Sequence, residues 1–200
     1  MENKIETKFK AKAKDSFKTK INLFIFSLVI EKRVSFTVED FHNFKITNDL
    51  VTLFSAEYWQ LPRKSNINNM SIDDIYKQIL KLKEDNKDII NILKPEYINL
   101  FSTIFPENEF EKLLSVKQCH YCKVTNVEIY KLAEKHQLFS KNERGRSLEI
   151  DRRNSNYEYT PDNCVMACYW CNNAKTDEFT MDEFKEIGDI IGNIWKKRLE

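Results

Sequence analysis

Glycine and proline are scarce in this sequence, with 3 and 4 residues among 200. So few glycines exclude a glycine-rich loop wrapped around a phosphate, and they disfavour an all-β chain with many tight turns. The net charge is also close to zero, at +1. That value excludes a chain held to nucleic acid by bulk positive charge alone, although it leaves room for a local basic patch.

A long apolar run is missing as well. The longest extends only from Leu23 to Ile30 and contains Ser27, whereas a helix needs about 20 apolar residues to cross a bilayer. The basic N-terminal segment has neither the apolar stretch nor the small-residue cleavage site of a secretory signal. We therefore expect a soluble, cytoplasmic chain without membrane association. A hydrophobic content of 42% is enough for a core and excludes full disorder.

Cysteine is absent from the first 118 residues, and four of the five cysteines form two C-x-x-C pairs: Cys119 with Cys122, and Cys168 with Cys171. An odd cysteine count without a secretory signal argues against a disulfide framework. Two such pairs supply the four thiolates that Zn²⁺ prefers in a tetrahedron. The sequence therefore predicts one structural zinc ion. Cys164, beside apolar residues, is predicted to be buried in a strand.

The cysteine distribution divides the chain into two predicted regions. Residues 1–115 are predicted to be mostly helical, and residues 116–200 to form a small zinc-containing domain, which gives an α+β fold class. A region of about 85 residues has a small core that a metal ion would stabilise. The role of residues 1–115 stays open between target recognition, dimerisation and docking of a partner protein, and so does the oligomeric state.

Local signals predict several helix starts. Four serine or threonine residues precede an acidic residue by three positions, as in a capping box, and Pro95 and Pro106 are also predicted to begin helices. The four capping residues are Thr37, Ser71, Thr125 and Thr180. In residues 116–200 we predict a helix over 126–138, a polar loop over 140–146, a strand over 147–151, extended chain over 157–167 with a turn at 161–163, and a helix that opens at Cys171.

Two N-terminal segments leave alternatives open. Residues 1–20 carry seven lysines against three acidic residues. They form either a solvated, frayed tail or a surface that contacts phosphates. Residues 21–36 form either a buried helix or a strand.

The motifs of the second region follow a characteristic order. Cys119–Cys122 (CHYC) precedes Leu148–Arg152 (LEIDR), then Asn163 in a turn, then Cys168–Lys175 (CYWCNNAK). Over about residues 117–178 this order resembles the zinc-bearing branch of the HNH, or ββα-metal, endonuclease superfamily. The resemblance implies a metal-dependent endonuclease that hydrolyses phosphodiester bonds in DNA, and a restriction, mobile-element or phage-defence setting would suit such an enzyme. The alternative is an inactive zinc module that binds nucleic acid or a partner protein.

The resemblance also implies a role for each motif residue. Asp151 and Asn172 would ligate a catalytic Mg²⁺ or Mn²⁺, because hard cations prefer oxygen ligands and can neutralise charge on a phosphate. Asn163 would hold the turn in shape, and the four paired cysteines would clamp hairpin and helix through zinc. Because Asp151 is assigned to the catalytic ion, its replacement is expected to spare the fold. Residues expected to hold the DNA backbone are Arg146, Arg153 and Lys175.

The sequence departs from the family at Arg152, where the family usually has the histidine that acts as general base. A guanidinium keeps its proton at any working pH and cannot accept another. Glu149 shares a strand face with Asp151, so it either activates water or forms an ion pair with an arginine. Arg152 itself would then clamp the scissile phosphate and stabilise its charge.

Overall fold

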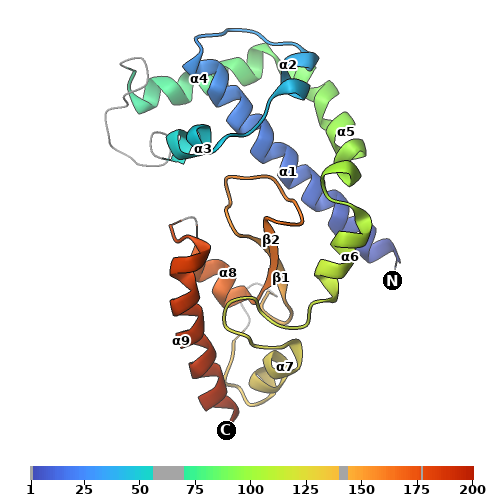
Figure 1. The fold of residues 1–200 in the computed structure, drawn as a ribbon, viewed down its shortest axis with the longest axis vertical. Helices are drawn as coiled ribbons and strands as arrows, with labels where there is room; N and C mark the ends of the chain where they lie inside the picture. The colour runs from blue at the N-terminus through green and yellow to red at the C-terminus, as the bar shows by residue number, and fades with distance from the viewer. Residues whose placement is uncertain (1, 56–69, 140–143, 177) are drawn as a thin grey trace. The chain divides into compact units, whose positions relative to one another are not determined.

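The computed structural model describes residues 2–55, 70–139, 144–176 and 178–200 (Figure 1). Within these ranges the chain is mostly helical and contains one small two-stranded sheet. This confirms the predicted α+β class. Among the described residues, no helix combines the length and the apolar character needed to cross a membrane.

The chain divides into two compact units. Unit 1 comprises Met1–Ile104 and Asn156–Tyr159, and unit 2 comprises Phe105–Ser155 and Thr160–Glu200. The short segment 156–159 belongs to unit 1 because the backbone N–H of Tyr159 donates to the buried Ser16 hydroxyl, at 3.1 Å. The division thus falls after residue 104, whereas the sequence places it after residue 115.

Unit 1 is organised around one long helix. This helix, α1, packs against α3, α4 and α5, and aromatic rings from α1, α2 and α5 fill the core, with Phe24 in an edge contact with Phe41 at 5.4 Å. The helices of unit 1 are α1 (Glu2–Ile30), α2 (Val38–Asn43), α3 (Asn48–Phe54), α4 (Ile72–Asp85) and α5 (Lys87–Ile104).

The structure shows the conformation of both N-terminal segments. Residues 2–30 form a single helix, so the apolar stretch after residue 20 is helical as far as Ile30 and the lysine-rich segment is not a frayed tail. Thr37 and Ser71 cap α2 and α4 as predicted. The predicted helix start at Pro95 is wrong, because Pro95 lies inside α5. Buried side chains on both sides of it, among them Leu93 and Tyr97, hold that helix together across the lost hydrogen bond.

Unit 2 places an antiparallel hairpin among four helices within its described residues. Strands β1 and β2 pair with Asp151 opposite Val165. A single residue, Cys168, separates β2 from α8, and α9 packs against both α7 and α8 (Figure 1). Pro106 is the N-cap residue of α6, so its predicted helix start is confirmed. The elements are α6 (Glu107–Ser115), α7 (Asn126–Glu134), β1 (Glu149–Arg152), β2 (Cys164–Ala167), α8 (Tyr169–Lys175) and α9 (Met181–Leu199).

Several predicted boundaries in unit 2 shift by a few residues. Helix α7 ends at Glu134 instead of residue 138, because His136 adopts a left-handed conformation (φ 54°) and its N–H donates to the Ala133 carbonyl. Strand β1 begins at Glu149 rather than at 147. Cys164 is buried in β2 as predicted. Of the predicted loop over 140–146, residues 140–143 lie outside the described residues.

Two of the three glycines allow α9 to pack closely on the first cysteine pair. A Cβ atom on Gly188 would lie 2.8 Å from the Tyr121 Cβ, and one on Gly192 would lie 2.5 Å from the Cys122 carbonyl oxygen. Both glycines are buried on one face of α9. The absence of side chains there lets the helix backbone approach the loop that carries Cys119 and Cys122.

We expect Gly192→Ala to destabilise unit 2 by about 1–3 kcal/mol, because the added methyl would push against backbone. This sign is opposite to the usual effect in a helix interior, where alanine is about 1 kcal/mol better than glycine. Thermal unfolding measures it. The exposed neighbour Asn193 provides the control, since Asn193→Ala should leave the melting temperature unchanged or raise it. Stabilisation by Gly192→Ala would contradict the close approach.

Candidate metal centre and active site

Two loops far apart in the sequence bring four cysteines together. The sulfur atoms of Cys119, Cys122, Cys168 and Cys171 all lie within 4.8 Å of one another, and all four side chains are buried. The Sγ atoms of Cys122 and Cys168 are 3.6 Å apart, close to the roughly 3.8 Å between sulfurs on a tetrahedron with 2.3 Å Zn–S bonds. The geometry and the soft donor set fit a structural zinc ion.

Four buried thiols at this spacing strongly influence one another. Hydrogen bonding with Cys122 and the other two thiols lowers the pKa of Cys119. Hydrogen bonding with Cys119 raises the pKa of Cys168 and of Cys171. Against the opposing effect of Cys119, hydrogen bonding with Cys168 and Cys171 also lowers the pKa of Cys122. Ionisation is therefore favoured at the first cysteine pair and opposed at the second, and a bound cation would stabilise all four thiolates.

The first cysteine pair lies in a tight turn fixed by backbone hydrogen bonds. The N–H of Cys119 donates to the Val124 carbonyl at 2.8 Å, and Lys123 takes the left-handed conformation after the second cysteine (φ 63°). The N–H of His120 donates to the Met166 carbonyl of β2, also at 2.8 Å. This loop is therefore attached directly to the hairpin.

The second cysteine pair begins α8. Cys168 is the N-cap residue, and its sulfur accepts a hydrogen bond from the N–H of Cys171 at 3.4 Å. This cap explains why α8 begins at Tyr169, two residues before the predicted start. A cysteine of the cluster thus also serves as the start of the helix that carries Asn172.

Asp151 is the buried carboxylate of β1, with 8% of its surface exposed. Its Oδ2 accepts a hydrogen bond of 2.6 Å from the hydroxyl of Tyr121, which directly precedes Cys122. Burial raises the pKa of Asp151, while the Tyr121 hydrogen bond and the charge of Lys175 oppose that rise. Burial and the same hydrogen bond raise the pKa of Tyr121, so its hydroxyl stays a donor.

Lys175 corrects one sequence-based expectation. It was expected to hold the DNA backbone, but it is 2% exposed and its Nζ lies 3.8 Å from the Asp151 Oδ2. An ammonium buried against a carboxylate is not at the surface to meet a phosphate. The pair also alters the expectation that replacing Asp151 spares the fold, because such a variant leaves a buried charge without its partner.

Glu149 and Asn172 form the second contact between β1 and α8. The Nδ2 of Asn172 donates to the Glu149 Oε2 at 3.1 Å, and Arg144 contacts both Glu149 oxygens, through Nε at 3.0 Å and through Nη2. Of the two roles considered for Glu149, the structure contains the ion pair. Glu149 and Asp151 thus face Asn172 and Lys175, which sets the register of β1 on α8.

Asn163 lies in the segment that connects β1 to β2. Its side chain and its backbone both form hydrogen bonds with the residues that follow β1. Its Oδ1 accepts from the N–H of Asn154 and its Nδ2 donates to the Asn154 carbonyl, each at 3.0 Å. Its backbone carbonyl accepts from the N–H of Arg153 at 2.8 Å. These bonds close the end of the hairpin immediately after Asp151 and Arg152.

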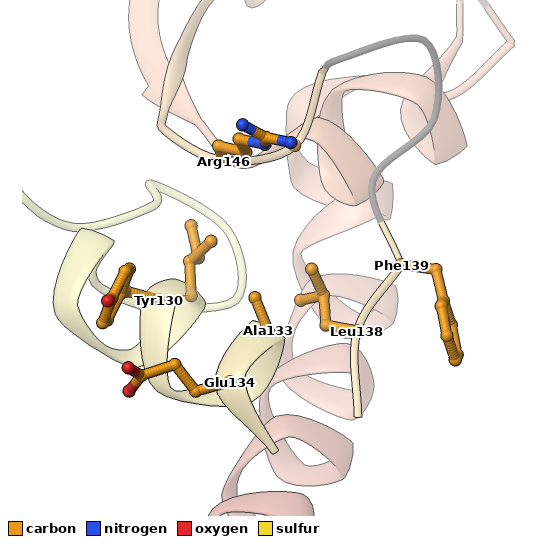
Figure 2. Close-up of a pocket in the computed structure, with 8 residues that line it drawn as sticks. Tyr130, Ala133, Glu134, Leu138, Phe139 and Arg146 are labelled. Carbon is orange, nitrogen blue, oxygen red and sulfur yellow. The ribbon is translucent and has the colours of Figure 1, made fainter. Parts of the chain in front are cut away.

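The predicted phosphate-binding arginines lie in different surroundings. Arg152 is partly buried on β1 and Arg153 is exposed just beyond it. Arg146 lines a pocket of about 490 Å³ whose other walls come from α7 and the segment after it, including Tyr130, Glu134 and Leu138 (Figure 2). Arg146 therefore faces a partly apolar hollow that contains a carboxylate.

Sequence reasoning missed two residues that touch the predicted site. Tyr121 has no predicted role beyond its place in the CHYC motif, and Arg144 was not singled out among the charged residues of its loop. Arg144 also stacks over Tyr169, 4.9 Å from the ring centre. A buried zinc loop beside an acidic strand was the available signal for Tyr121, because a phenol there needs a polar partner.

No protein-family model matches the chain, and no curated protein does. A solved structure of the rare-cutting HNH restriction endonuclease PacI, described as exhibiting an extraordinary mechanism of DNA perturbation, matches part of it. The chain is similar in part to an HNH restriction endonuclease. The identity is 23%, the match covers 47% of this chain and 66% of that chain, and the TM-score is 0.40.

We expect Cys171→Ser to release zinc and unfold unit 2. Structural zinc sites contribute about 10–16 kcal/mol of apparent binding free energy, more than a domain of this size has in reserve. Elemental analysis and circular dichroism measure both effects. Cys164→Ser is the matched control, because Cys164 is buried outside the cluster, and it should keep the zinc. Equal damage from the two variants, or no zinc in the purified chain, would refute the assignment.

Proposed function

We propose that this chain is a metal-dependent endonuclease that hydrolyses phosphodiester bonds in DNA, and that residues 117–178 form its HNH-like ββα-metal domain. The observation that carries the proposal is the contact between the acidic face of β1 and α8. Glu149 bonds to Asn172, and Asp151 pairs with Lys175 three residues further along the helix. The two expected metal ligands, Asp151 and Asn172, thus stand on elements that pack together.

The donor atoms suit a hard divalent cation. Asp151 offers a carboxylate, and Asn172 donates through its nitrogen to Glu149, which leaves its amide oxygen as a ligand atom. Asp151 and Asn172 would hold Mg²⁺ or Mn²⁺, which would neutralise charge on the scissile phosphate. Tyr121 orients the Asp151 carboxylate from the zinc loop. Arg152 and Arg153 add positive charge where β1 ends, for contact with the DNA backbone.

One observation favours the alternative of a zinc module that binds without cutting. Both oxygens of Glu149 accept hydrogen bonds from Arg144, and one also accepts from Asn172. A carboxylate held in this way is a poor proton acceptor, and Arg152 cannot accept a proton at all. The motif therefore lacks a free base among these residues, which would slow hydrolysis or prevent it.

We expect Asp151→Asn to abolish nicking of supercoiled plasmid in Mg²⁺ or Mn²⁺. The single variant should also lose about 3–5 kcal/mol of stability, because Lys175 is left buried and unpaired. The double variant Asp151→Asn/Lys175→Met removes both charges and should recover most of that stability while remaining inactive. Lys175→Met alone retains the carboxylate and should still cut. Wild-type nicking by the folded double variant would refute the proposed active site.

The identity of the base can be tested at Arg152. Because Glu149 is engaged in its ion pair, we expect Arg152→His to raise the cleavage rate, since a general base contributes roughly 10²–10⁴-fold. The rate should then increase with pH through a titration near 6.5, the ordinary histidine value.

If the wild type cuts DNA, Glu149→Gln tests whether Glu149 is the general base. If Arg152 clamps the phosphate and Glu149 is the base, Arg152→His lowers the rate and Glu149→Gln abolishes it. If both Arg152→His and the wild type bind duplex DNA and remain inert in every divalent metal, the non-cutting module is the correct function.

A further inference from the structure

The lysine-rich half of α1 presents four lysines without partners. Lys4, Lys8, Lys14 and Lys18 are exposed. Within the described part of the chain none of them forms a hydrogen bond or an ion pair with a carboxylate, whereas Lys10 bonds to Glu6. The name lysine face is used below for these four residues.

The lysine face occupies one side of the helix. At 100° per residue the four positions fall within an arc of about 120°. The buried residues of the same segment, Ala13, Ser16 and Phe17, lie on the opposite side, against the core of unit 1. The acidic residue within the arc, Asp15, is bonded to Lys12 at 3.3 Å. The face is therefore positive and directed away from the core.

This arrangement opposes the stability of the isolated helix. Lys4 with Lys8 and Lys14 with Lys18 are like-charge pairs four residues apart, which destabilise a helix by a few tenths of a kcal/mol each. Lys4 also stands in the first turn, where the helix dipole disfavours a cation. On α4, Lys83 lies close enough to Lys18 for repulsion to contribute to a lowered pKa of Lys83, after burial as the larger cause. An anionic ligand would relieve each of these repulsions.

We propose that the lysine face binds the phosphate backbone of duplex DNA. Lysines four residues apart on a helix lie about 6 Å apart along its axis and span about 21 Å from Lys4 to Lys18, so they can meet several phosphates of one strand. This interface lies on unit 1 and uses none of the residues proposed for cleavage. It gives unit 1 a role in holding DNA that does not depend on the DNA sequence.

The chemistry of the face favours a duplex over other polyanions. Thr7 and Ala11 lie between the lysines and no aromatic residue does, so the face lacks the rings on which unpaired bases stack. A helix that lies on a membrane needs an exposed apolar side, and here the apolar side of α1 is buried, with Phe17 and Phe24 in the core. A face that offers positive charge, but no ring for stacking and no apolar surface, suits the regular phosphate backbone of a duplex.

The test compares two full-length triple variants of equal net charge. Lys8→Gln/Lys14→Gln/Lys18→Gln removes three residues of the face. Lys10→Gln/Lys87→Gln/Lys112→Gln removes three lysines that are paired with Glu6, Glu84 and Glu109. Fluorescence anisotropy with a labelled duplex, without Mg²⁺ or Mn²⁺, gives the binding constant between about 50 and 200 mM salt. Circular dichroism checks that both variants remain helical.

We expect the face variant to reduce the slope of log K against log salt by about 2–3, and to weaken binding by about 100-fold near 0.1 M salt. The control should change the slope by less than about 1. Equal effects in both variants, tighter binding of RNA duplex than of DNA, or an effect seen only with anionic vesicles would overturn the proposal.

The outcome of this binding test can be distinguished from the outcome of the cleavage test of the proposed endonuclease. If the wild type never cuts but the slope falls only in the face variant, the DNA interface stands and the endonuclease does not. If the wild type cuts and the face variant binds like the wild type, the interface is wrong while the endonuclease stands. If the wild type binds no duplex DNA, the interface is overturned.

Discussion

Unit 2 depends on the meeting of four thiols from two distant loops. The first loop bonds to β2 through His120 and lies against α9 at Gly188 and Gly192, while the second loop caps α8 through Cys168. Hairpin and helices therefore converge on one centre, which lies within the buried apolar cluster of unit 2. A metal ion adds stability that the core of so small a unit supplies only in part. A bound zinc ion would fix the hairpin, α8 and α9 by fixing the two loops.

The same centre reaches the predicted active site through Tyr121. This side chain is packed beneath α9 and donates to Asp151, so the position of a zinc loop determines the orientation of a carboxylate on β1. Lys175, on α8, approaches the same carboxylate oxygen, Oδ2, at 3.8 Å. A buried ion pair contributes little net stability; its effect here is to fix β1 against α8 in one register. Structure and proposed chemistry are thus coupled by two side chains.

Structural features that depend on neighbouring residues were predictable from the sequence. Contacts between residues far apart in the sequence were not. The caps at Thr37, Ser71, Thr125 and Thr180 are all present because each joins positions three apart. Helix ends were harder to predict. Two residues after the ends of α1 and α7, Lys32 and His136 adopt the left-handed conformation, without the glycine that usually marks it. The cluster of four cysteines was predictable from their spacing. The burial of Lys175 and the Arg144–Glu149 pair were not, because they arise only when β1, α8 and the loop pack.

Net charge conceals the most informative electrostatic feature of unit 1. A value of +1 averages over the whole chain, but the acidic residues of α1 are largely occupied, Glu6 by Lys10 and Asp15 by Lys12. The four residues of the lysine face are exposed and have no carboxylate partner among the described residues. The other half of α1 carries buried residues such as Phe24 and Ile25, which anchor the helix in the core. One continuous helix therefore presents its charges from a rigid base, and a rigid array of cations loses less entropy on meeting a regular array of phosphates than a frayed tail would.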